Sequence, residues 1–231
     1  MATVRFSPID DRPESLAEMV YEAIRQSIMD KTLKPGSRVS EVGLARQLGV
    51  SKTPVREAML RLRRIGVIES EGLRGGQVVR PSVAAIRQAY ELREALEVFA
   101  VRQVAAERDP EDVERISQAA AMSLERARAG DQAGFREWDG VFHRAIADAA
   151  DNPRLAELID DVFTLIVTLR QRDYPNVAAS VECGVAHTRI ADAIARRDTD
   201  AAETAAREHI RQVEGFVLTG GGLPAGDGGP S

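Results

Sequence analysis

The segment from Ser40 to Gly66, SEVGLARQLGVSKTPVREAMLRLRRIG, constrains the fold more than any other part of the chain. Apolar residues repeat at helical spacing on both sides of Gly49, which predicts a helix over 41–48, a tight turn, and a second helix opening near Ser51. Serine is a preferred N-cap residue, and a glycine after the last periodic residue can end a helix in the left-handed conformation. The sequence therefore predicts a helix-turn-helix.

The second helix of this motif has one apolar face and one basic face. Four apolar residues recur at helical spacing: Val55, Ala58, Met59 and Leu62. The remaining side carries Lys52, Thr53, Arg56 and Arg63. Seven Lys/Arg and two Glu lie between Arg38 and Arg64, a balance that suits phosphate neutralisation. Either this helix enters a DNA major groove with its N-terminal residues at the base edges, or it is the solvated basic face of an ordinary helical hairpin.

The run LKPGSRVSEVGLARQLGVSKTPVREAMLRLRRIGVIES resembles the winged helix-turn-helix of GntR-family transcription regulators, and SKTPVREAM is its most specific part. The resemblance extends from about Pro13 to Pro81. It implies that three elements contact DNA: the arginine that precedes the first helix of the motif, the residues that open the recognition helix, and an arginine within the recognition helix. These positions are here Arg38, Ser51, Lys52, Thr53 and Arg56. Lysine at position 52 departs from the arginine more usual in the family and lacks its bidentate geometry, which puts guanine reading there in doubt.

Residues Val67 to Arg80 read as two short strands, VIES and QVVR, around a glycine-bearing tip from Gly72 to Gly76. The pattern is typical of a β-wing. Gly75 and Gly76 would allow the wing backbone to approach DNA closely, or they only make the turn.

The chain is expected to be mainly α-helical and to contain two domains. A flexible arm (1–12) precedes the winged helix-turn-helix (13–81), and an all-helical bundle (82–218) is followed by a disordered tail (219–231). Cap-proline pairs at Asp109-Pro110 and Asn152-Pro153 predict helix starts. The expected helices outside the motif are 15–30, 83–107, 110–129, 132–150, 153–173, 176–197 and 199–218.

Composition separates the two predicted domains by charge. Residues 1–80 carry 14 Lys/Arg and 10 Asp/Glu, whereas the rest carries 17 and 26, so only the first part is suited to nucleic acid. A single cysteine, Cys183, excludes an internal disulfide and fits a reducing compartment. No signal pattern and no apolar run of membrane-spanning length is present. A cytoplasmic protein without a membrane partner is expected.

All three histidines, His143, His187 and His209, fall in the acidic part, each on or beside the apolar stripe of its predicted helix. Asp139 precedes His143 by four residues, which places both on one helical face. These four inward-pointing groups could surround one divalent metal ion, with bonds of about 2.0–2.2 Å if it is zinc. Taken singly, each histidine is better explained as a hydrogen-bonded core residue, and the case for a metal rests on the set.

WDGVFHRAIADAADNPRL resembles the D-x-x-x-H segment of the FCD domain, the effector-binding domain of the FadR-type branch of GntR regulators. HTRIADAIARRDTDAAETAAREHI is similar to its last two helices, and YELREALE to its first. The resemblance implies Asp139, His143, His187 and His209 as metal ligands. Zinc is the expected ion, with nickel and manganese as alternatives.

Arg93 interrupts an apolar line on the helix 83–107, and so does Glu97. The pair is an i,i+4 salt bridge at the edge of the core, or Arg93 is a fork for an effector carboxylate; both hold if Glu97 orients Arg93. The FCD resemblance implies the effector role for Arg93.

Together these features predict a DNA-binding transcription regulator, expected to be a repressor, that is controlled by a small organic acid. Two recognition helices must meet two half-sites, so a homodimer on a palindromic operator in double-stranded DNA is expected. Two alternatives stay open: a DNA-binding protein with a purely structural metal, and a metal-dependent hydrolase. No HExxH motif supports the hydrolase, and no enzymatic activity is expected.

Overall fold

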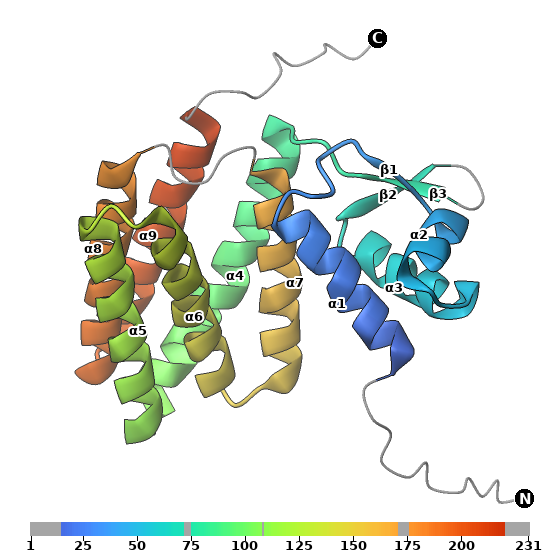
Figure 1. The fold of residues 1–231 in the computed structure, drawn as a ribbon. Coiled ribbons are helices and arrows are strands. Elements are labelled where there is room, and N and C mark those ends of the chain that lie inside the picture. The colour runs from blue at the N-terminus through green and yellow to red at the C-terminus, as the bar shows by residue number, and fades with distance from the viewer. Residues whose placement is uncertain (1–14, 72–74, 108, 171–175, 220–231) are drawn as a thin grey trace, which may run out of the picture. The chain divides into compact units, whose positions relative to one another are not determined.

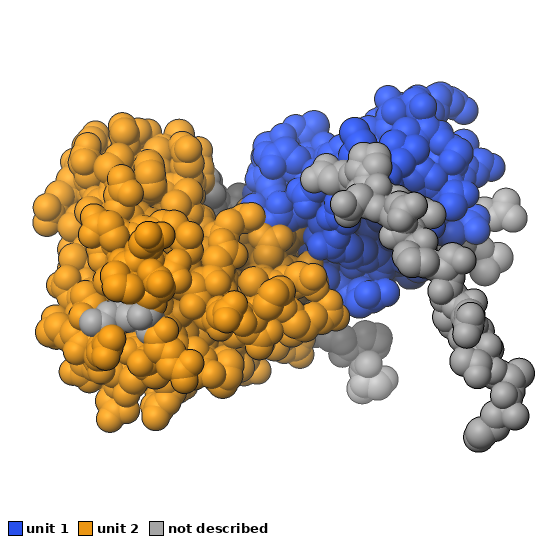
Figure 2. Space-filling model, turned by 90° about the horizontal axis from the view of Figure 1, so that it is seen from below, with its two compact units in different colours: residues 1–79 blue, residues 80–231 orange. Residues whose placement is uncertain are grey.

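The structure is a computed structural model that describes residues 15–71, 75–107, 109–170 and 176–219. The chain divides into two compact units, residues 1–79 and residues 80–231, which are distinguished by colour in Figure 2. Each unit has its own core. No helix within the described ranges is long and apolar enough to cross a lipid bilayer.

Unit 1 is a small helical domain with a three-stranded antiparallel sheet (Figure 1). Helices α1 and α2 pack on α3, and the apolar face of α3 predicted from the sequence is almost completely buried. The elements are α1 (Leu16–Met29), β1 (Arg38–Ser40), α2 (Glu41–Leu48), α3 (Lys52–Arg64), β2 (Ile68–Glu71) and β3 (Gly75–Val78). The mainly helical fold with a β-wing is therefore confirmed.

The turn between α2 and α3 forms as its sequence predicts, apart from one cap. Ser40 caps α2 by accepting a 3.0 Å hydrogen bond from the Gly43 amide. Gly49 ends the helix at φ +67°, a left-handed conformation that glycine adopts without steric cost. Ser51 occupies the N-cap position of α3, but its hydroxyl accepts no capping hydrogen bond.

The wing has a third strand that the sequence did not predict, and one strand was placed two residues too late. β3 pairs with both β1 and β2, so the strand order is β1-β3-β2. Gly75 and Gly76 belong to β3 rather than to the tip, and residues 72–74 lie outside the described ranges. A Cβ at Gly76 would stand 2.4 Å from Ile68 Cγ2 and 2.9 Å from the Glu69 carbonyl oxygen. Packing within the wing therefore accounts for glycine at position 76.

Unit 2 contains only helices among its described residues. They are α4 (Val83–Glu107), α5 (Pro110–Arg128), α6 (Gln132–Ala149), α7 (Pro153–Leu169), α8 (Val177–Ala195) and α9 (Thr199–Thr219). Both cap-proline pairs begin helices as predicted: Asp109 accepts from the Glu111 amide and Asn152 from the Leu155 amide.

The bundle of unit 2 is held by a small number of extensive helix contacts. α5 packs against α6 and α8, α4 packs against α9 and α7, and α8 packs against α9 (Figure 1). Helix α7 is shorter than predicted. It ends at Leu169 because Arg170 turns to an extended conformation and directs its guanidinium to the Tyr90 hydroxyl. Residues 171–173, which were expected to continue this helix, lie outside the described ranges.

Candidate metal centre and nucleic-acid interface

The opening of α3 presents its polar residues outward. Ser51, Lys52, Thr53 and Arg56 are exposed, and the Arg56 side chain has 59% of its surface accessible. Arg56 Nε lies 3.3 Å from a carboxylate oxygen of Glu41, which is itself buried at the start of α2. Glu41 therefore restrains the direction of the Arg56 guanidinium and leaves most of its surface open.

The two remaining predicted DNA contacts lie in the wing sheet. Arg38 is exposed at the start of β1, opposite Gln77 of β3. Gly75 lies in β3 opposite Ser40, and its carbonyl oxygen accepts a 2.9 Å hydrogen bond from Arg63 Nη2. Gly75 is therefore a strand residue whose carbonyl oxygen is held by a hydrogen bond from α3.

Unit 2 brings the predicted metal ligands together at its centre. Asp139 and His143 come from α6, His187 from α8 and His209 from α9, and all four are at most 5% exposed. The candidate ligand atoms of the three histidines lie within 4.8 Å of one another. Asp139 Oδ1 is 3.6 Å from His187 Nε2 and 3.8 Å from His143 Nε2. Helices far apart in the sequence thus converge on one buried cluster.

Neighbouring side chains fix the orientation of the His187 and His143 imidazoles. Ser123 of α5 donates its hydroxyl proton to the Ala120 carbonyl and lies 3.0 Å from His187 Nδ1. A hydroxyl has one proton, so Nδ1 of His187 is assigned as the N–H donor, and Nε2 keeps its lone pair toward the cluster. Similarly, Glu97 lies 2.8 Å from His143 Nδ1 and accepts its proton. Such outer partners are typical of metal-binding histidines.

Electrostatics favour neutral forms of His187 and His209 and an ionised Asp139. Burial lowers the pKa of His187 to about 3, helped by repulsion from His143, and burial likewise lowers the pKa of His209 well below its ordinary value. Burial opposes ionisation of Asp139, but attraction to His143 and His187 outweighs it and lowers its pKa. Neutral imidazoles and a carboxylate are the forms that ligate metal ions.

Arg93 extends into the same cluster from α4. It is 2% exposed, and its Nε donates a 2.6 Å hydrogen bond to Glu97. Its Nη2 lies 2.8 Å from His143 Nε2, and Nη1 has no hydrogen-bond partner among the described residues. The i,i+4 salt bridge with Glu97 is therefore present, and the Arg93 guanidinium also reaches the histidine cluster.

Two further buried residues of the site, Cys183 and Arg170, were not assigned a role from the sequence. Cys183 of α8 is fully buried between Asp139 and His187, and its only sequence signal was its helical spacing with His187. Arg170 is 6% exposed, and its Nη2 donates a 2.8 Å hydrogen bond to the Tyr90 hydroxyl. Nothing in the local pattern around Arg170 distinguishes it from a surface arginine.

The residues present fit a metal ion. His209 Nε2 is buried without a hydrogen-bond partner among the described residues, and a buried polar atom of this kind is costly unless a ligand satisfies it. Imidazole nitrogens with one carboxylate oxygen form a donor set that zinc and related divalent ions accept. The cluster of His143, His187 and His209 can therefore hold a metal ion.

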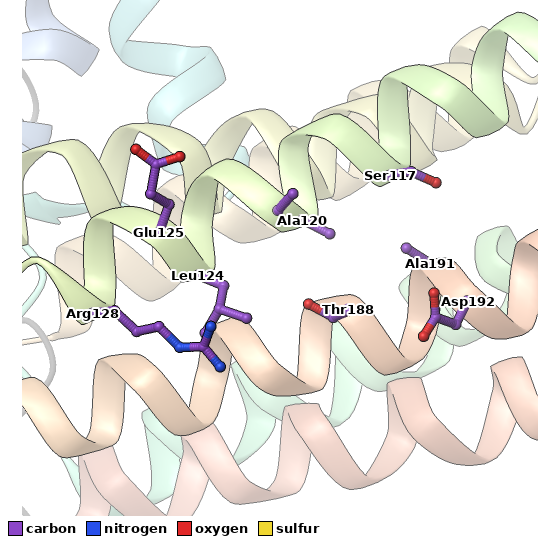
Figure 3. A pocket seen from close by; sticks show the side chains of 9 residues that line it. Ser117, Ala120, Leu124, Glu125, Arg128, Thr188, Ala191 and Asp192 are labelled. Atoms are coloured by element: carbon purple, nitrogen blue, oxygen red, sulfur yellow. The ribbon is translucent and has the colours of Figure 1, made fainter.

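A separate open groove of about 360 Å³ runs between α5 and α8 (Figure 3). Small side chains from the two helices, among them Ala120 and Ala191, line its floor, and Arg128 and Asp192 carry charges along it. None of the clustered donors lines this groove. The buried cluster and the groove are therefore distinct features of unit 2.

Two protein-family models match the chain, one for each unit. Residues 16–78 match the model described as bacterial regulatory proteins, gntR family, and residues 88–212 match the FCD domain. The second match alone covers more than half of the chain.

Curated relatives extend over nearly the whole chain. The regulator LutR of Bacillus subtilis (strain 168) is 30% identical over 214 residues, which cover 84% of this chain and 96% of LutR. The transcriptional repressor RspR of Escherichia coli (strain K12) is 27% identical over 203 residues, covering 87% of this chain and 88% of RspR. These relatives are transcription regulators and not enzymes.

Solved structures match the fold. A GntR regulator from Rhodococcus sp. RHA1 has a TM-score of 0.68 at 27% identity, covering 87% of this chain and 97% of that one. Escherichia coli McbR/YncC has a TM-score of 0.74 at 23% identity, covering 88% and 97%, and supports the fold alone. The protein therefore belongs to the GntR family, in the FadR-type branch that carries an FCD domain, and is a DNA-binding transcription regulator.

Proposed function

We propose that the protein is a repressor whose operator affinity is controlled by a small organic acid bound beside a metal ion in unit 2. The observation that carries the proposal is the buried cluster of Asp139, three histidines and Arg93 in the same chain as a recognition helix. A metal supplies a Lewis-acidic position for one carboxylate of the effector. Asp139, His143, His187 and His209 would hold the ion, with zinc expected and nickel or manganese as alternatives.

The contacts of Arg93 suggest how the effector and the metal ligands are coupled. His143 Nδ1 is engaged by Glu97, so Nε2 is the nitrogen left to ligate a metal, and Arg93 Nη2 donates to that same atom. If Nε2 were to ligate the ion, Nη2 would lose this acceptor. Nη2 and the unpartnered Nη1 then offer two donors, the arrangement that binds a carboxylate in bidentate fashion. Glu97 keeps the guanidinium in place through Nε.

We infer a homodimer because one recognition helix meets only one half-site of a palindromic operator. Leu92 and Phe99 lie seven residues apart on α4, and 48% and 49% of their respective surfaces are accessible. Two large apolar side chains repeating at this spacing on a helix are suited to a symmetric interface.

Leu92→Glu combined with Phe99→Glu is expected to give a monomer at micromolar concentration, because charges on an apolar interface are costly to bury. Sedimentation velocity of the full chain measures this. The control is Leu158→Glu, an apolar residue on α7 that is 41% exposed, and this change should leave the dimer intact. Dimers in the double variant would place the interface elsewhere.

For the DNA interface we propose Arg56 as a base-reading residue, with Ser51, Lys52, Thr53, Arg38 and Gly75 as further contacts. Arg56→Ala is expected to weaken specific operator binding by about 1–3 kcal/mol. Arg38→Ala, a phosphate contact, should weaken binding to all sequences alike and flatten its salt dependence.

Fluorescence anisotropy at fixed salt, with an operator selected from a random duplex pool, tests both substitutions. Arg154→Ala is the charge-matched control, because this exposed arginine lies on α7 in unit 2. Operator affinity that is unchanged in Arg56→Ala would remove this residue from the interface.

A purely structural metal is the competing role, and the deep burial of the cluster favours it. The two roles differ in one observable. A structural ion stabilises unit 2 and leaves operator affinity insensitive to organic acids, whereas a regulatory site links the two.

A further inference from the structure

The cysteine of α8 lies inside the candidate metal centre rather than beside it. Cys183 Sγ is 3.7 Å from His187 Nε2, 3.8 Å from Asp139 Oδ1 and 3.9 Å from His209 Nδ1. Two donors bound at about 2.0–2.3 Å to one tetrahedral ion lie about 3.3–3.8 Å apart. The spacings among Asp139, Cys183 and His187 therefore match those of ligands around a single ion.

Donor atoms of three neighbouring side chains lie 3.7 to 3.9 Å from the Cys183 sulfur. The hydrogen bond to Ser123 leaves the lone pair on His187 Nε2, the nitrogen nearer the sulfur. His209 is 2% exposed; its Nδ1 is the nitrogen 3.9 Å from the sulfur, and its Nε2 has no hydrogen-bond partner among the described residues. The Nε2 atom of His143, in contrast, already accepts a hydrogen bond from Arg93.

The close approach of α8 to α5 holds this arrangement. A Cβ at Gly184 would stand 2.8 Å from Leu124 Cα, so only glycine at this position lets the two helices meet so closely. Gly184 directly follows Cys183, and Ser123 directly precedes Leu124. The contact therefore fixes both the sulfur and the serine that orients His187.

We propose that Cys183 is a metal ligand, which makes the centre a mixed site of sulfur, imidazole nitrogen and carboxylate oxygen. This inference rests on the proposed metal site and adds a donor to it. On binding, the S–H bond breaks, the proton passes to solvent, and a sulfur lone pair forms the bond to the ion. A thiolate is a soft donor, so the centre selects zinc or cobalt over manganese.

Cobalt(II) tests the assignment, because a thiolate bound to cobalt gives an intense near-ultraviolet charge-transfer band that nitrogen and oxygen ligands do not give. Cys183 is the single cysteine of the chain, so the band can have no other internal source. We expect the band in the full-length wild-type protein titrated with one equivalent of cobalt(II). In Cys183→Ser the band should vanish while the weaker visible bands of bound cobalt persist. The preference for zinc over manganese should fall by about tenfold or more.

X-ray absorption at the zinc edge of the wild-type protein gives a second measurement that needs no variant. A sulfur neighbour at about 2.3 Å is expected. Cobalt or zinc bound with only nitrogen and oxygen neighbours would overturn the role of Cys183 and leave the metal site standing. Failure of the wild-type protein to bind either ion would overturn both.

Discussion

Glu97→Ala is expected to destabilise unit 2 by about 3–5 kcal/mol, because it leaves the Arg93 guanidinium charged and without a counter-ion inside the bundle. Arg93 is 2% exposed, and Glu97 accepts both its Nε–H and the Nδ1–H of His143. Burial opposes the charge on Glu97, but attraction to Arg93 outweighs it and lowers the pKa of the carboxyl. The pair is therefore ionised, and removing one partner is costly.

Urea denaturation followed by tryptophan fluorescence measures this effect in the correct unit, because Trp138 of α6 is the single tryptophan. Glu94→Ala is the matched control on the same helix. Glu94 is half-buried and pairs with the solvent-accessible guanidinium groups of Arg207 and Arg211, and ion pairs open to solvent typically contribute about 1 kcal/mol or less. Arg93→Met combined with Glu97→Leu should cost much less than Glu97→Ala, since both charges leave together. Equal losses in Glu97→Ala and Glu94→Ala would contradict a buried, ionised pair.

His187→Ala is expected to produce the second large effect, a loss of metal affinity greater than the roughly 10–100-fold that follows removal of an outer partner. His187 is fully buried and lies within reach of Asp139, Cys183 and the other two histidines. Competition with a chelator of known affinity measures the change. Operator affinity without effector should stay within about twofold, because the recognition helix belongs to unit 1.

Ser123→Ala provides the internal comparison for His187→Ala. It removes the hydrogen bond that orients His187 and keeps every candidate ligand. Metal affinity should therefore fall by only about 10–100-fold, as it does when an outer partner is removed. Stoichiometric metal in the variant with all three histidines changed to alanine would show that the ion binds elsewhere.

Much of the fold follows from local sequence signals. Helix starts at Asp109-Pro110 and Asn152-Pro153 were predictable because a capping side chain followed by proline favours one conformation. Strand β1 was missed because three residues between a turn and a helix carry no periodicity. It exists because β3 pairs with it, a contact between segments about 40 residues apart. The end of α7 was missed for a similar reason, since Arg170 leaves the helix toward Tyr90 of α4.

In the candidate metal centre, too, local spacing could be predicted from the sequence and tertiary contacts could not. Asp139 and His143 could be joined from the sequence because four residues separate them on one helix. The convergence of α6, α8 and α9 on one cluster was a hypothesis that the FCD resemblance favoured, and the structure places the three histidines together. The positions of Cys183 and Ser123 could not be predicted, because they depend on how closely α5 approaches α8 at Gly184.

We propose that the cluster in unit 2 controls the DNA affinity of unit 1. The most direct test of this proposal is an operator titration of the zinc-loaded protein in the presence of individual mono- and dicarboxylic acids. We predict that at least one acid changes operator affinity by about 5- to 150-fold, the range of a 1–3 kcal/mol coupling, and that His187→Ala abolishes this change. An undiminished response in His187→Ala or in the metal-stripped protein would contradict the claim.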